Sequence, residues 1–134
     1  MSNLPFKAIY IQESRTQIAG ELRATLRRGG VRVSENFEDA TFSIDIVQEN
    51  YVKRILSLSD TGVVREFELD YRVIFRTRSA AQPLWNEPQL VQLRRNFSYN
   101  DNAILAKAEE EQNLATDMRH DAVREILRRL SSQK

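Results

Sequence analysis

The segment 66–76 alternates between apolar and charged residues more strictly than any other part of the chain. Because successive side chains of a β-strand point to opposite faces of a sheet, this period of two predicts a strand with one buried and one solvated face. The apolar set is Phe67, Leu69, Tyr71, Val73 and Phe75, and the charged set is Glu66, Glu68, Asp70, Arg72 and Arg76. The rest of the chain must therefore supply elements that cover the apolar face.

Two further extended segments flank this strand. Residues 42–58 alternate less regularly, and the parity of the apolar positions slips near Val47, which predicts a β-bulge or a strong bend. Residues 59–62, Ser-Asp-Thr-Gly, have the composition of a turn, and residues 91–99 alternate again after a polar stretch at 79–88. Three long strands in succession predict an antiparallel meander.

Shorter elements precede the meander. Residues 7–11 predict a strand, and residues 14–28 predict an amphipathic helix that begins with a capping box of Ser14 and Gln17. Two glycines at 29 and 30 are expected to end this helix. Residues 31–34 predict a short strand, and residues 35–41 predict a loop.

From about Asp101 to Leu130 the period is helical. Acidic residues lie early in this helix and arginines lie late, as the helix dipole favours. The expected fold is an α/β (α+β) two-layer sandwich, with both helices on one face of a mainly antiparallel sheet. We expect a single domain over residues 1–134, with residues 1–5 flexible. The apolar stripe of the last helix is expected at Ile104, Ala108, Ala115, Met118, Ala122, Ile126 and Leu130, widened by Leu105, Leu114, Val123 and Leu127.

Composition narrows the function classes. The formal net charge is +1, so no long-range field would draw the whole molecule to nucleic acid or an anionic bilayer. The chain has no cysteine, which excludes disulfides, thiolate catalysis and sulfur-ligated zinc. No segment reaches the run of about 18 apolar residues that a membrane-spanning helix needs. The opening Met1-Ser2 fits both a native cytosolic start and a chain expressed without its signal peptide.

Residues that suggest catalysis lack the partners that catalysis needs. The only histidine, His120, has no second histidine or cysteine at metal-ligand spacing and is expected on the surface. Consecutive glutamates at 109–111 radiate in different directions from a helix and are expected to be solvated. Phosphate loops and nucleophile elbows are absent from the sequence. We therefore expect no enzymatic activity, no cofactor and no metal.

A nucleic-acid-binding module or a generic α/β adaptor is the alternative. Phe67, Tyr71 and Phe75 alternate on a strand rich in arginine, which resembles a base-stacking platform. Acidic residues interleave the same strand, however, and aromatic residues on an amphipathic strand beside two amphipathic helices are more often core. We expect these aromatic side chains in the core and no nucleic-acid partner.

Several segments, taken in order, resemble one family. The segment 65–73, Arg-Glu-Phe-Glu-Leu-Asp-Tyr-Arg-Val, is similar to a strand of the LptE family of lipopolysaccharide-assembly lipoproteins. The stretch 95–107 is similar to that family's junction between strand and helix, and the motifs at 109–111, 118–122 and 126–130 resemble its final helix. The match extends more weakly to Ile9 and so covers nearly the whole chain.

The resemblance implies a role without catalysis. LptE proteins plug the LptD outer-membrane barrel, assist its assembly and bind lipopolysaccharide on its way to the outer leaflet. They are lipid-anchored on the periplasmic side of the outer membrane through a cysteine that follows a signal peptide. Because this chain has no cysteine, the anchor is expected only if the chain starts downstream of that residue.

The resemblance also implies a binding site for lipopolysaccharide. Lys107 is the best match to a ligand-binding lysine of the family, and the turn around Asp60 is the other region that the family uses. Arg65, Lys53 and Arg54 are the cations near that turn. For Lys107, a solvated lysine that pairs with Glu111 one helical turn later stays open as the alternative.

Overall fold

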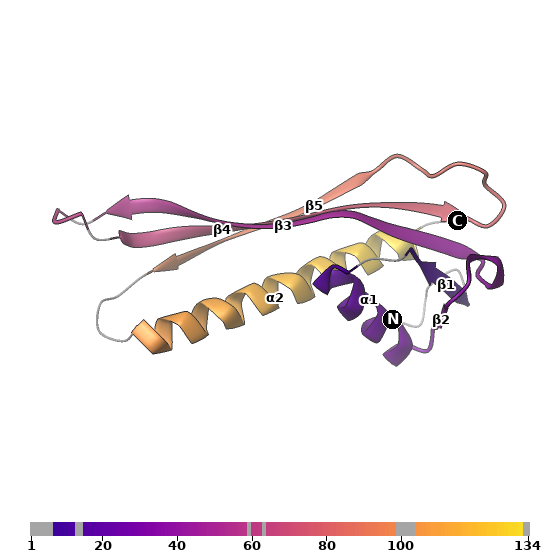
Figure 1. Cartoon of the computed structure of the whole chain (residues 1–134), viewed down its shortest axis with the longest axis horizontal. Helices are drawn as coiled ribbons and strands as arrows, with labels where there is room; N and C mark the ends of the chain where they lie inside the picture. The colour runs from indigo at the N-terminus through magenta and orange to yellow at the C-terminus, as the bar shows by residue number, and fades with distance from the viewer. Residues whose placement is uncertain (1–6, 13–14, 59, 63, 99–103, 133–134) are drawn as a thin grey trace.

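The computed structural model describes residues 7–12, 15–58, 60–62, 64–98 and 104–132, without the side chains of 64, 65 and 104–107. The flexibility expected of residues 1–5 therefore concerns positions outside the described residues. Along the chain, the elements are β1 (Ala8–Ile11), α1 (Gln17–Arg28), β2 (Arg32–Ser34), the 3-10 helix η1 (Phe37–Asp39), β3 (Phe42–Leu58), β4 (Val64–Ser79), β5 (Gln89–Ser98) and α2 (Ile104–Ser131) (Figure 1).

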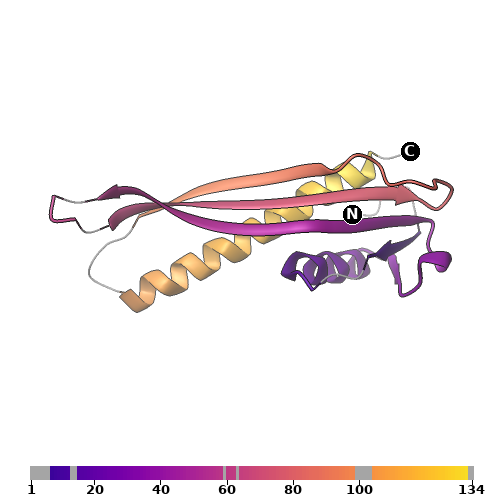
Figure 2. The same cartoon turned by 45° about the horizontal axis from the view of Figure 1, so that its top comes forward.

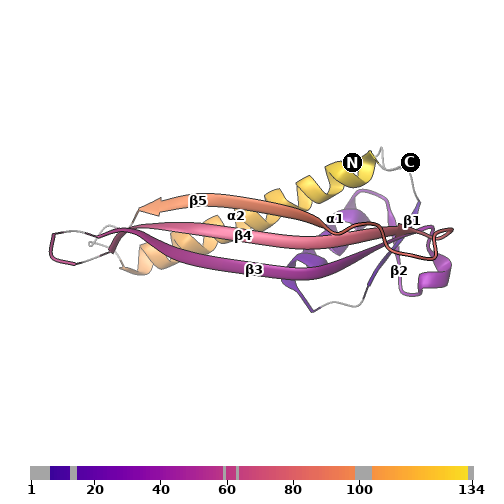
Figure 3. The same cartoon turned by 90° about the horizontal axis from the view of Figure 1, so that it is seen from above.

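The five strands form one open sheet in the order β2-β1-β3-β4-β5. Strand β1 is parallel to both β2 and β3, whereas β3, β4 and β5 form the predicted antiparallel meander. Both helices lie on the same side of the sheet (Figure 2), so the sheet hides much of them when it is viewed from above (Figure 3). The predicted α+β fold, with two helices on one face of a mainly antiparallel sheet, is confirmed.

The predicted irregularity near Val47 is a register shift in the pairing of β3 with β4. Ile46 lies opposite Phe75, but Gln48 lies opposite Ile74, so Val47 is an extra residue and its side chain is 51% exposed. Directly opposed residues of an antiparallel pair share a face. The bulge therefore turns the odd-numbered residues from Glu49 to Ile55 toward the helices, and a second register shift after Ile55 ends this pattern.

The start of α1 differs from the prediction. The cap is Thr16, whose hydroxyl accepts a hydrogen bond from the backbone N–H of Ala19 at 3.3 Å, and the helix begins at Gln17. The predicted capping box was wrong, because the extended backbone at Thr16 places its own hydroxyl over the first turn. Ser14 lies outside the described residues. Within the predicted 35–41 loop, residues Phe37–Asp39 form the 3-10 turn η1.

The hydrophobic core lies between the helices and the inner face of the sheet. The aromatic residues of β4 belong to it as predicted, with Tyr71 and Phe75 buried and Phe67 half-buried against it. Helix α1 contributes Ile18, Ala19, Leu22 and Leu26, and α2 contributes Met118, Ala122, Val123, Ile126, Leu127 and Leu130.

The first part of α2 departs from the predicted stripe. The side chains of Ile104 and Leu105 lie outside the described part of the chain. Among the described side chains of α2, Ala108 is exposed, Leu114 and Ala115 are half-buried, and the first buried residue is Met118. Figures 1 and 2 show the reason, because α2 diverges from the sheet toward the end where the β3–β4 turn lies. We call this the hairpin end; its opposite is the α1 end, where α1 lies with β1 and β2.

Candidate functional site

The residues predicted to bind lipopolysaccharide lie toward the hairpin end of the molecule. Lys53 and Arg54 belong to the distal half of β3, Arg65 lies at the start of β4, and Lys107 lies in the first turn of α2. The side chains of Arg65 and Lys107 are outside the described part of the chain. The backbone thus gathers residues from three elements at one end, and the contacts of Lys53 and Arg54 can be described in full.

Lys53 and Arg54 point to opposite faces of the sheet. Lys53 lies opposite Leu69 and so faces the helices, where its Nζ donates to Glu111 Oε1 at 2.6 Å. Arg54 lies opposite Glu68 on the outer face, where it contacts Glu68 at 3.4 Å and Asp70 at 3.0 Å. The structure therefore separates two cations that are adjacent in the sequence.

Lys53 combines a charge with an aromatic surface. Its Nζ lies 4.1 Å from the centre of the Phe67 ring, which in turn packs against Phe97 at a centroid distance of 6.5 Å. The ion pair with Glu111 is partly solvent-exposed, so water weakens it. An anionic group that approached this side of the sheet could therefore compete with Glu111 for Lys53.

Exposed apolar side chains lie along β3 on both sides of Lys53, with Tyr51 and Ile55 on its own face and Val52 on the outer face, and we call them the hairpin-end strip. Beyond Ile44, the outer edge of β3 has no partner strand among the described residues, which leaves side chains uncovered on both faces. Ile55, at 58%, is the most exposed member. An apolar strip of this kind beside a cation suits a ligand that is both apolar and anionic. The strip consists of Tyr51, Val52, Ile55, Leu56 and Leu58.

Arg54 belongs to a separate cluster built around Asp70. Asp70 is only 1% exposed although it lies on the outer face, because Arg54, Arg72 and Arg94 cover it at 3.0, 3.2 and 3.8 Å. Burial alone would raise the pKa of Asp70, but the hydrogen bond from Gln92 at 3.0 Å and the charges of Arg72 and Arg94 outweigh it and lower that pKa. Arg54 therefore already has anionic partners within the protein.

Sequence reasoning missed the hairpin-end strip and the burial of Asp70. A signal for the strip was present, because residues 51–58 carry apolar side chains on both parities, which one buried face cannot accommodate. Asp70 gave no such signal, since its covering arginines come from three different strands.

The remaining predicted surface residues lie where their charges suggested. His120 is exposed, and its Nε2 lies 3.2 Å from Glu21 Oε1. Glu109 and Glu110 are exposed, and Glu111 is half-buried in its pair with Lys53. Across the described ranges, no group of three acidic or histidine side chains could hold a metal ion, and neither helix has an apolar stretch long enough to cross a membrane.

Comparisons with known proteins agree on one family. A family model described as "LptE: Lipopolysaccharide-assembly" matches residues 6–130. The solution structure of an uncharacterized lipoprotein B from Nitrosomonas europaea is 39% identical, with a TM-score of 0.84, and the match covers 98% of this chain and 86% of that one. The search of curated proteins found no match.

Two crystal structures extend the comparison. That of the rare lipoprotein B from Shewanella oneidensis is 25% identical, with a TM-score of 0.81, over 93% of this chain and 94% of that one. A minor lipoprotein from Acinetobacter baumannii is 18% identical, with a TM-score of 0.73, over 96% of this chain and 93% of that one. The last of these shows only that the fold is shared.

Proposed function

Since this chain belongs to the LptE family of lipopolysaccharide-assembly proteins, we propose that it binds lipopolysaccharide and plugs the LptD outer-membrane barrel, whose assembly it assists. In this role it is a component of lipopolysaccharide transport that binds its ligand and its partner barrel and catalyses no reaction. The single observation that carries the ligand-binding part is the hairpin-end strip, which places Lys53 among exposed apolar side chains.

The chemistry of lipopolysaccharide fits this surface. Its phosphates favour lysine and arginine, and its acyl chains favour exposed apolar side chains. The proposed contacts are Lys53, Lys107 and Arg65 for the phosphates and the hairpin-end strip for the acyl chains. Arg54 would join them only from the outer face, where Asp70 and Glu68 already engage it.

The surface also suits the interior of a large barrel. The lumen of such a barrel is polar, so a plug needs a water-soluble surface of mixed charge. With 20 basic and 19 acidic residues, the chain has this balance. Figure 3 shows from above the face of the elongated sheet that no helix covers. The charged side chains around Asp70 lie on this face.

The family and the solved lipoproteins point to an outer-membrane-associated lipoprotein. We propose that the native protein is held on the periplasmic side by a lipid anchor. The alternative, a nucleic-acid-binding module, loses its main support, because Tyr71 and Phe75 are buried and cannot stack on bases.

Exchange of Lys53 and of Glu111 should have opposite effects on lipopolysaccharide binding. Lys53→Gln removes a cation and should weaken the affinity by up to about tenfold, or about 1.4 kcal/mol, as should Lys107→Gln. Glu111→Gln frees Lys53 from a competitor and should tighten binding by about twofold to fivefold, because an exposed ion pair contributes about 0.2–1 kcal/mol. The measurement is a titration of immobilised protein with purified lipopolysaccharide.

Glu109→Gln is the matched control, because it removes the same charge from an exposed position of the same helix. Its affinity should stay close to that of the unmodified protein. If Glu109→Gln tightens binding as much as Glu111→Gln does, net charge alone governs affinity. In that case, or if Lys53→Gln and Lys107→Gln both bind normally, the assigned site is wrong.

A further inference from the structure

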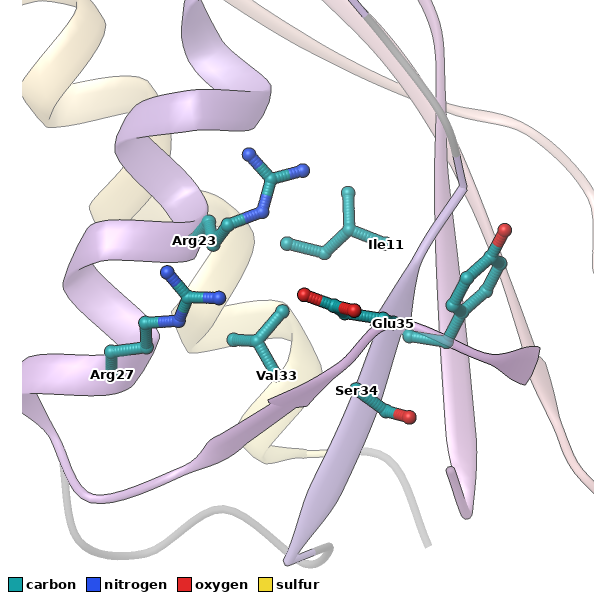
Figure 4. A pocket seen from close by; sticks show the side chains of 7 residues that line it. Ile11, Arg23, Arg27, Val33, Ser34 and Glu35 are labelled. Atoms are coloured by element: carbon teal, nitrogen blue, oxygen red, sulfur yellow. The ribbon is translucent and has the colours of Figure 1, made fainter. Parts of the chain in front are cut away.

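A cavity of about 420 Å³ lies at the α1 end of the molecule, between α1 and the last residues of β1 and β2 (Figure 4). Ile11 ends β1, Ser34 ends β2, and Glu35 follows directly. Clefts of this size bind small molecules, and in open sheets the carboxyl ends of parallel strands are a common place for them. The hairpin-end strip lies at the other end, so this cavity is separate from the proposed lipopolysaccharide site.

Charged groups converge on this cavity from two sides. Arg23 and Arg27 lie one helical turn apart on α1, and Figure 4 shows both guanidinium groups directed toward the cavity. The carboxylate of Glu35 points toward them from the strand side, and Ile11 and Val33 supply apolar side chains between the charges. The arrangement combines cations, an anion and an apolar floor within one small space.

These three charged groups have no partner among the residues that the structure describes. Neither arginine side chain forms an ion pair or a hydrogen bond there, and the same holds for the side chain of Glu35. The neighbouring Arg28 and Arg32, in contrast, donate to Thr25 Oγ1 at 3.2 Å and to the backbone oxygen of Asp39 at 3.4 Å. The hydrogen-bonding capacity of the cavity is therefore available to a ligand.

The charges define the class of ligand. Two arginines and one glutamate sum to +1, so a ligand of net charge −1 would balance them. A phosphate monoester with two negative charges matches the two guanidinium groups, each of which can donate to two of its oxygens. An ammonium group on the same ligand would match Glu35 and bring the net charge to −1. A carboxylate with an ammonium group is neutral and would leave one arginine uncompensated.

We propose that this cavity binds a phosphate ester that carries an ammonium group, with Arg23 and Arg27 on the phosphate and Glu35 on the ammonium. The apolar side chains of Ile11 and Val33 would contact the short carbon chain between the two groups. The ester is a soluble phosphate monoester, because the phosphodiester in the head group of phosphatidylethanolamine carries only one negative charge and would leave one arginine uncompensated.

Titration with O-phosphoethanolamine, followed by NMR or calorimetry, tests this proposal. Arg23→Gln and Arg27→Gln should each weaken binding by about tenfold or more, as expected for a lost charge-assisted contact. The unmodified protein should prefer O-phosphoethanolamine to ethyl phosphate, and the Glu35→Gln variant should lose that preference. β-Alanine, which has a carboxylate in place of the phosphate, should bind more weakly than O-phosphoethanolamine.

Arg28→Gln is the control, because it removes the same charge from an exposed neighbouring position of α1. Its affinity should be unchanged, and an equal loss in this variant would overturn the proposal. Binding to phosphatidylethanolamine vesicles as tight as binding to O-phosphoethanolamine would show that the second negative charge of the phosphate is not recognised, and would overturn the proposal. Absence of binding to O-phosphoethanolamine would also overturn the proposal, while the titration with lipopolysaccharide would be unaffected.

Discussion

Ile126→Ala should lower the free energy of unfolding by about 2–5 kcal/mol, the usual cost of truncating a fully buried aliphatic side chain. Ile126 is 0% exposed and belongs to the stripe with which α2 covers the sheet. Leu114→Ala, three turns earlier on the same helix, should cost only about 1 kcal/mol, because Leu114 is half-buried and leaves a smaller cavity. Urea unfolding followed by circular dichroism measures both.

The contrast between these variants tests how firmly α2 is held along its length. If Leu114→Ala destabilises the protein as much as Ile126→Ala, the first half of α2 is packed like the second. The hairpin end would then have no loosely covered surface for a ligand, and the proposed lipopolysaccharide site would be wrong. A small cost at Leu114 would agree with a helix anchored at its end and open at its start.

Asp70→Asn should lower the free energy of unfolding by about 2 kcal/mol at neutral pH. The substitution removes the charge that holds Arg54, Arg72 and Arg94 together, and hydrogen bonds to charged groups contribute about 1.5–3 kcal/mol. Part of this is lost to solvent, because the arginines are about half-exposed and can turn to water. Chemical denaturation measures the difference, and Glu68→Gln, which removes only a 3.4 Å contact with Arg54, is the milder control.

The cost of Asp70→Asn should depend on pH in one direction. Because the folded protein lowers the pKa of Asp70, the carboxylate stabilises the fold above the unfolded value of about 3.9. That contribution is lost as the pH falls through the lowered pKa of the folded state. The difference between the two proteins should therefore be constant near neutral pH and shrink below about pH 4. A difference that grew on acidification would contradict the role assigned to Asp70.

The sequence predicted the architecture because the spacing of apolar residues along the chain matches the periods of a strand and of a helix, and these periods decide which side chains face the core. The apolar residues that alternate at 67–75 form the inner face of β4, and the parity slip at Val47 corresponds to a register shift between β3 and β4. The positive φ of 84° at Gly62 agrees with the glycine expected in the turn. Each of these features depends on residues close in the sequence, which is where pattern reasoning is strongest.

The details of the site depend on contacts between distant residues and were not predictable in this way. Lys53 meets Glu111 across 58 positions, and Arg54 meets Asp70 across 16. The bulge at Val47 determines which face of the sheet Lys53 and Arg54 lie on. A slip in the apolar parity shows that a bulge is present, but it does not show which residues face the helices after it. The stripe of α2 was predicted too long, because periodicity identifies a helix face but not where the sheet stops covering it.

The most direct test of the proposed function is co-purification of the lipid-anchored protein with the LptD barrel from outer membranes, with photocrosslinkers at Asp60 and Arg128. These exposed positions report on opposite ends of the molecule. We predict that the two proteins purify together and that crosslinks form to the barrel's lumen wall. A protein that reaches the membrane fraction but purifies without LptD, with no crosslink from either position, would contradict the proposed function.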